Sequence, residues 1–166
     1  MTDDEEDFAI CDVAFHEAGH AVIGFLTGNV PILASIVPDA DDYSSGRVEF
    51  AYSAYLELAS ISHLPLEFAD ELEASVLTTL AGTIAENIFR ISVGQGLADD
   101  CDVDFAVCML DEFGIDEDEG GPYFARARTR AHELLIQHWS SVERVATELL
   151  VYRTLSRHEI LSLIYT

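Results

Sequence analysis

The chain contains no lysine and only eight arginines, compared with 31 aspartates and glutamates. The formal net charge is therefore 8 − 31 = −23. A surface this acidic repels nucleic acids and anionic membranes, which argues against DNA-, RNA- and membrane-binding functions. It attracts cationic peptides and metal ions instead.

Cysteine is also scarce: Cys11, Cys101 and Cys108 are odd in number and show no C-x-x-C spacing. We interpret them as reduced thiols of a cytosolic protein. Long apolar runs are missing as well, since none approaches the roughly 18 residues that a membrane span needs. Residues 1–7 are acidic, unlike the start of a secretory signal. The sequence therefore predicts a soluble, cytoplasmic protein.

A chain of 166 residues, 49% of them hydrophobic, is long enough to bury the core of one domain. We expect residues 1–7 to form an acidic disordered tail and residues 8–166 to form a single domain. Hydrophobic periodicity predicts an α+β fold, mostly helical, with about five helices and one small antiparallel sheet. The strands are expected at Ile32–Val37 and Arg47–Tyr52. Their sheet edge either holds an extended peptide or belongs to a structural hairpin.

The predicted helices carry recognisable start and stop signals. The expected segments are a helix from Asp12 to Thr27 ended by Gly28, one from about Pro65 through Ile88, one that starts near Asp102, one from Pro122 to about Tyr152, and one through Ile164 after the Ser156–Glu159 capping box.

The most specific motif is HEAGH at residues 16–20, which matches the H-E-x-x-H pattern. His16 and His20 are four residues apart, so on a helix they share one face and can bind one metal ion. Glu17 lies at the flank of that ion, where it can accept a proton from a water molecule that the metal acidifies. Three polar side chains in an apolar helix would be costly without such a role.

A third ligand is expected where the helix near residue 102 begins. Asp99, Asp100, Asp102 and Asp104 are more carboxylates than capping that helix requires, so one of them could close a metal site. Glu86 lies on a mostly apolar helix and needs a partner. It is either an acceptor for a ligand histidine or an exposed or separately paired side chain.

Several short segments occur in the order found in one protease family. They are His16–Ala21, Ala34–Pro38, Leu80–Glu86, Asp102–Ala106 and Thr154–Ile160. Together they resemble the peptidase domain of the FtsH-type ATP-dependent zinc metalloproteases, over nearly the whole chain after residue 12. The resemblance implies the fold of that domain, Zn²⁺ as the cofactor and a zinc metalloendopeptidase activity.

In that family the third zinc ligand is an aspartate in an Asn-Asp-Leu-x-x-Ala-Thr motif. Matching by helical phase puts Val103 and Ala106 at the Leu and Ala positions, which implies Asp102 as the ligand. Counting from Gly96 would select Asp100 instead. We prefer Asp102, because helical phase is a physical constraint whereas loop length varies.

The sequence departs from the family because it has neither the P-loop G-x-x-x-x-G-K-[ST] motif nor a membrane anchor. We therefore expect that the protein does not use ATP and that its substrates are peptides or unfolded proteins. Its partner could be a second copy of the chain in a homo-oligomer or a separate unfoldase. The leading hypothesis is a zinc metallopeptidase with His16, His20 and Asp102 as metal ligands and Glu17 as the catalytic base. The alternative is a non-proteolytic peptide- or protein-binding module. A closed structural zinc site usually needs four Cys or His ligands, and no such set is visible.

Overall fold

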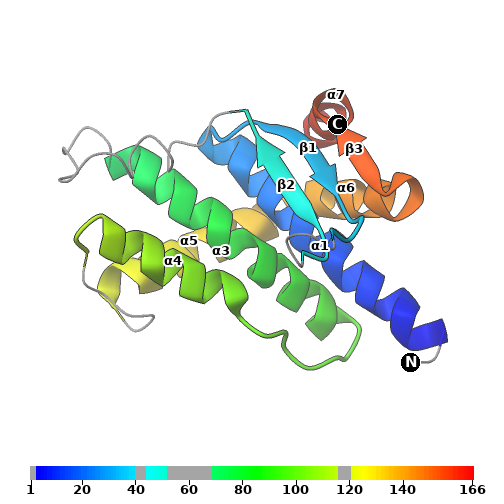
Figure 1. The fold of residues 1–166 in the computed structure, drawn as a ribbon, viewed down its shortest axis with the longest axis horizontal. Helices are drawn as coiled ribbons and strands as arrows, with labels where there is room; N and C mark the ends of the chain where they lie inside the picture. The colour runs from blue at the N-terminus through cyan, green and yellow to red at the C-terminus, as the bar shows by residue number, and fades with distance from the viewer. Residues whose placement is uncertain (1–2, 40–43, 52–68, 116–120) are drawn as a thin grey trace.

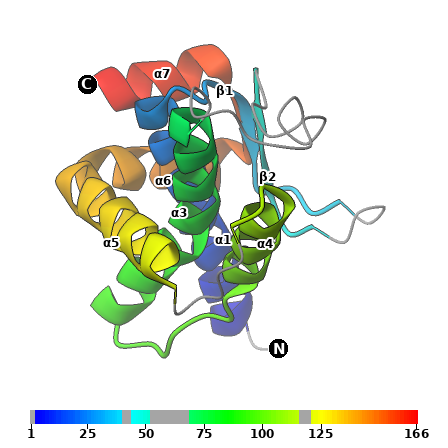
Figure 2. The same cartoon turned by 90° about the vertical axis from the view of Figure 1, so that its left-hand side faces the viewer.

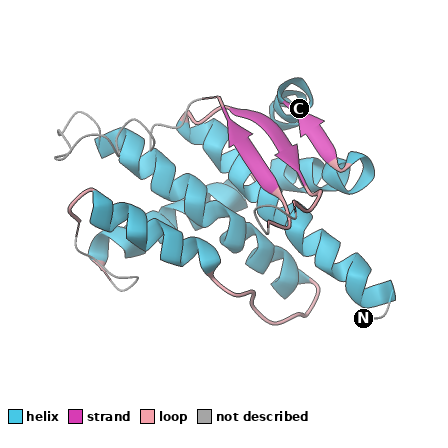
Figure 3. Ribbon diagram, viewed as in Figure 1, coloured by secondary structure: helices cyan, strands magenta, loops and turns pink. Residues whose placement is uncertain are grey.

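The computed structural model describes residues 3–39, 44–51, 69–115 and 121–166. Over these residues the protein is mostly helical with one small antiparallel sheet, as predicted (Figure 1, Figure 3). The described elements are α1 (Asp3–Thr27), β1 (Pro31–Ser35), β2 (Arg47–Phe50), α3 (Ala69–Ser92), α4 (Cys101–Glu112), α5 (Pro122–Gln137), α6 (Trp139–Tyr152), β3 (Thr154–Ser156) and α7 (Arg157–Tyr165).

Helices α1 and α3 lie side by side at the centre of the fold (Figure 1, Figure 2). They approach closely because Gly19 on α1 has no side chain. A Cβ at Gly19 would lie 2.5 Å from the carbonyl oxygen of Ala81 and 2.6 Å from the Cβ of Ala85, both on α3. Small residues at this crossing therefore bring the two helix backbones together, and the side chains that flank it can meet across the contact.

Helix α1 is a core helix. By length and composition alone, Phe8–Thr27 could cross a membrane, although polar residues such as His16 and Glu17 interrupt its apolar sequence. In this fold Ala14, Val22 and Ile23 of that segment are fully buried within the protein. They belong to the same hydrophobic cluster as buried residues of α3, α5 and α6.

β1 is the central strand of the sheet, whose strand order is β2-β1-β3. Ala34 lies opposite Val48 of β2 on one side and Leu155 of β3 on the other, and both pairings are antiparallel. The two predicted strands are present but end early, at Ser35 and Phe50. β3 was not predicted, since three residues are too few to show an alternating pattern. Because β1 is paired on both sides, the outer edges of the sheet, as far as the structure describes it, are those of β2 and β3.

The start of α1 corrects the sequence prediction. α1 begins at Asp3 rather than near Asp12, so the helix includes residues 3–7 of the expected acidic tail. No proline or glycine interrupts residues 3–12, so the helix can continue toward the N-terminus beyond the apolar pattern. The predicted end is confirmed: Gly28 follows the helix with a φ of 98°, a conformation that glycine adopts without strain.

The helix predicted from Pro122 to Tyr152 is also different, because it is two helices. His138, with φ −112° and ψ 21°, leaves helical geometry between α5 and α6. The described part of the chain consequently has six helices rather than about five. The predicted start at Pro65 lies outside the described residues. The capping box of Ser156 and Glu159 is confirmed at the start of α7.

Candidate metal centre

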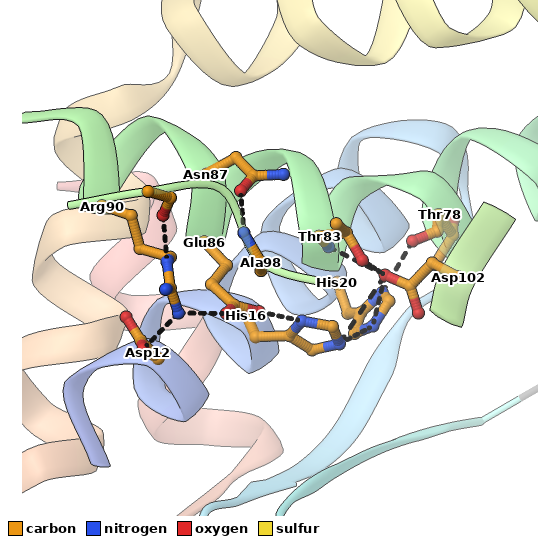
Figure 4. A network of polar contacts seen from close by, with 11 residues as sticks. Asp12, His16, His20, Thr78, Thr83, Glu86, Asn87, Arg90, Ala98 and Asp102 are labelled. Atoms are coloured by element: carbon orange, nitrogen blue, oxygen red, sulfur yellow. Dashed lines mark hydrogen bonds and ion pairs between the residues drawn. The ribbon is translucent and has the colours of Figure 1, made fainter. Parts of the chain in front are cut away.

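His16 and His20 lie on one face of α1 and point toward α3 (Figure 4). Their Nε2 atoms are 3.1 Å apart, and the rings meet edge to face at 79°. Each side chain is 17% exposed, so the pair is largely enclosed yet reachable from solvent. The four-residue helical spacing brings both nitrogens to one point, as expected from the motif.

Asp102, in the first turn of α4, lies beside the two imidazoles. Its Oδ2 atom is 3.6 Å from Nε2 of His16 and 3.8 Å from Nε2 of His20. Thr83 of α3 holds this carboxylate, because its backbone N–H and its hydroxyl both donate to Oδ2 at 2.8 Å. Asp100 instead lies 3.4 Å from the guanidinium of Arg128. The structure thus brings Asp102, and not Asp100, to the histidines.

The Nδ1 atoms of both rings, which point away from the centre, are hydrogen-bonded. These bonds restrict the protonation and orientation of the Nε2 atoms, which face the centre. Nδ1 of His20 donates to the carbonyl oxygen of Thr78 at 2.8 Å, since a carbonyl can only accept. Nδ1 of His16 lies 3.1 Å from Oε2 of Glu86, which is the acceptor role considered for Glu86 from the sequence. Neutral rings held in this way each present a lone pair at Nε2. A cation between the two nitrogens would satisfy both.

The spacing of these donors fits a metal ion. The three distances of 3.1, 3.6 and 3.8 Å compare with roughly 3.3–3.6 Å between ligands that lie 2.0–2.2 Å from a tetrahedral zinc ion. Gly82 of α3 keeps this space open: a Cβ there would lie 2.6 Å from Cε1 of His20 and 2.7 Å from Nε2 of His16. His16, His20 and Asp102 could therefore hold a metal ion together.

Glu17 extends from α1 toward the sheet. The residue is 6% exposed, and its carboxylate lies against Gly46, just before β2, where a Cβ would be 2.7 Å from Oε1. Burial raises the pKa of Glu17 from 4.5 to about 7, with the charge of His16 opposing the shift and that of Asp102 adding to it. A carboxyl group with such a pKa gives up and accepts a proton near neutral pH.

The surroundings shift the pKa values of the two imidazoles in opposite directions. Burial disfavours the charged form of His16, but the hydrogen bond that its Nδ1–H donates to Glu86 and the carboxylates of Asp102 and Glu17 outweigh it and raise its pKa. For His20, burial and the neighbouring His16 together lower the pKa. His20 is therefore neutral near pH 7, which is the form of imidazole that binds metals.

Sequence reasoning missed several side chains around the centre. Thr78, Thr83 and Arg90 all lie on α3, and Asp12 lies on α1 one turn before His16. The spacing of Arg90, four residues after Glu86, was a usable signal, since residues at i and i+4 are neighbours on a helix. Thr83 carried no such signal, because its partner Asp102 is on another helix.

No protein-family model matches the sequence, and a comparison with curated proteins finds no match either. The assignment of this centre therefore depends on its own residues and their geometry.

Proposed function

We propose that the protein is a zinc-dependent metallopeptidase related to the FtsH-type peptidase domain, with His16, His20 and Asp102 as the zinc ligands. The observation that carries this proposal is the arrangement of two imidazole nitrogens and one carboxylate oxygen 3.1–3.8 Å apart, with the buried Glu17 next to them in sequence. Two histidines and one carboxylate suit zinc, and three protein ligands leave a position open, as catalytic zinc sites do.

Zinc bound by these residues would supply a Lewis acid that polarises a peptide carbonyl and acidifies a water molecule. The chain itself supplies the ligands, their orientation and the proton acceptor. Glu86 and Thr78 hold the outer nitrogens of His16 and His20, so that the inner nitrogens face the centre. Thr83 fixes the carboxylate of Asp102.

Glu17 is the proposed proton carrier. Its carboxylate would accept the proton of the attacking water and then return it to the amine that leaves the cleaved peptide bond. The pKa near 7 that burial gives Glu17 suits both directions of this transfer. Its neighbour Gly46 leaves room for the carboxylate between α1 and the sheet.

The position of β2 supports a peptide substrate. β2 is an outer strand of the sheet, and the chain just before it touches Glu17. An extended peptide that paired with the outer edge of β2 would lie along the site, as strand addition requires. This mode of binding selects peptides and unfolded proteins, because a folded protein offers few segments with open backbone groups. The outer edge of β2 also supports the second candidate function, a module that binds peptides without cleaving them.

The decisive experiment combines metal analysis with peptide hydrolysis. The wild type should carry about one zinc per chain and cleave unfolded casein or a mixed peptide library. Glu17→Gln should keep the zinc and lose hydrolysis by several orders of magnitude, since an amide cannot accept the proton. His20→Ala should lose both. His158→Ala is the control, because His158 is exposed on α7.

The outcomes separate the candidates. A wild type without zinc would refute the proposal. Zinc binding and peptide binding without any cleavage, in both wild type and Glu17→Gln, would favour the binding module.

A further inference from the structure

Arg90 connects three parts of the protein around the proposed metal centre (Figure 4). It lies on α3, and its Nη1 atom is 2.8 Å from Oδ2 of Asp12 on α1 and 3.5 Å from Oε1 of Glu86. Its Nε atom donates to the carbonyl oxygen of Gly96 at 2.6 Å, in the segment between α3 and α4. One guanidinium thus contacts α1, which carries the histidines, and the segment that leads into α4, which carries Asp102.

The first connection leads to His16. The two oxygens of Glu86 have different partners: Oε2 lies 3.1 Å from Nδ1 of His16, and Oε1 faces Arg90. A carboxylate held at both oxygens cannot rotate without breaking a contact. Arg90 therefore fixes the direction from which Glu86 orients the imidazole, and with it the direction of Nε2.

The second connection leads to Asp102. The segment before α4 is tied to α3 at two points, by Arg90 at the carbonyl of Gly96 and by the side chain of Asn87, which accepts from the N–H of Ala98 at 2.8 Å. Asp102 follows within the first turn of α4. The path of this segment decides where Asp102 meets the histidines.

The geometry of the guanidinium explains why arginine serves here. Nε and Nη1 point in different directions within one rigid plane, so they can hold a backbone carbonyl and two carboxylates at once. A lysine ammonium has a single nitrogen and cannot reproduce this spread. The side chains of Arg90, Asp12 and Glu86 are only 22%, 11% and 14% exposed, which separates this network from surface ion pairs of small effect.

We propose that Arg90 is a positioning residue of the metal centre, which sets the orientation of His16 through Glu86 and the placement of Asp102 through Gly96. This inference rests on the proposed zinc centre. The competing explanation is that Arg90 only joins α1 to α3 and stabilises the fold. The two explanations differ in what happens to metal affinity at a temperature where the variant is fully folded.

Arg144 offers a matched control. It is another partly buried arginine whose Nε donates to a backbone carbonyl, that of Leu163, at 2.8 Å, and whose Nη2 donates to Ser141 at 3.0 Å. It joins α6 to α7 and touches none of the centre's residues in the part of the chain that the structure describes. Arg144→Met should therefore lower the melting temperature and leave metal affinity unchanged.

The experiment measures three quantities for the wild type, Arg90→Met, Arg90→Lys and Arg144→Met. They are the melting temperature of the metal-free protein, the zinc dissociation constant by chelator competition, and the visible absorption of the cobalt-loaded protein. Arg90→Met should raise the zinc dissociation constant by roughly 10–100-fold, the usual effect of losing a residue that orients a ligand. It should also change the cobalt spectrum, which reports the geometry of the ligands. Arg90→Lys should fall between Arg90→Met and the wild type.

A double-mutant cycle measures how far the effects of Arg90 and Glu86 on zinc affinity depend on each other. In a Glu86→Gln background, Arg90→Met should cost less affinity than it does alone, because the connection to His16 is already weakened. If Arg90→Met melts lower, as Arg144→Met does, but binds zinc within twofold of the wild type with an unchanged cobalt spectrum, the proposal is overturned and Arg90 is structural. If Arg90→Met does not fold, the same comparison with Arg90→Lys decides. A wild type that binds neither zinc nor cobalt would instead refute the proposed function itself.

Discussion

Thr83 gives two hydrogen bonds to a single oxygen of Asp102: its backbone N–H and its hydroxyl both reach Oδ2 at 2.8 Å. Thr83 is only 2% exposed, so neither bond competes with bulk water. The contact joins α3 to the first turn of α4 and holds the carboxylate against both imidazoles. The placement of Asp102 thus depends on a neighbour from a different helix.

Replacing Thr83 tests this support. Thr83→Val removes one of the two hydrogen bonds with almost no change in shape, so zinc affinity should fall by about tenfold. Thr83→Ser keeps the hydroxyl and should bind zinc nearly as the wild type does. Chelator competition measures both variants. Equal affinity for the valine and serine variants would show that the hydroxyl does not position the carboxylate.

The identity of the third ligand can be tested by comparing two aspartates. Asp102→Asn should weaken zinc binding far more than Asp100→Asn, because only Asp102 lies within 4 Å of both histidines. Asp100→Asn disturbs a contact with Arg128 between half-exposed side chains and should cost at most about 1 kcal/mol of stability. Zinc competition and thermal melting separate the two effects. Metal loss in Asp100→Asn with retention in Asp102→Asn would reverse the assignment.

Gly82 should tolerate no side chain. In Gly82→Ala the new methyl group would overlap the imidazoles of His16 and His20, so zinc binding should be lost and the metal-free protein should melt lower. Gly96→Ala is the matched control, since nothing among the described residues lies within 4 Å of a Cβ there and the substitution keeps the backbone carbonyl that Arg90 contacts. Metal content and melting temperature check both variants. Zinc binding by Gly82→Ala at the wild-type level would mean that α3 does not approach the centre this closely.

Asp12 should make stability depend on pH. Burial raises its pKa from 3.8 to about 6, with Arg90 opposing the shift and Glu86 adding to it. The folded protein then keeps a proton on Asp12 that the unfolded chain releases near pH 4, so the contribution of Asp12 to stability falls as pH rises from about 4 to about 6. Relative to Asp12→Asn, the metal-free wild type should lose stability across this window and stay level above it.

Urea unfolding at several pH values measures this difference, with Asp111→Asn, an exposed position at the end of α4, as the control. A wild type that gains stability relative to Asp12→Asn between pH 4 and pH 6 would show that the attraction of Arg90 outweighs burial.

Local patterns determined much of this protein. The two histidines and Glu17 are placed by the repeat of a single helix, and the capping box of α7 is a contact between residues three apart. The preference for Asp102 came from the resemblance, by matching the helical phase of this segment to the family's motif, and the structure puts Asp102 at the histidines. The need of Glu86 for a partner followed from the cost of burying a charge.

Tertiary structure alone decided the rest, because those features depend on contacts between distant segments. β3 forms because three residues near the end of the chain pair with β1, which lies near its beginning. The sequence of these three residues alone does not indicate a strand. The break at His138 arises in a segment whose apolar pattern continues through it. Thr83 and Arg90 acquire their roles only when α3 packs against α1 and α4. Helical periodicity tells which residues share a face, whereas the partner of that face is chosen by the packing of the whole fold.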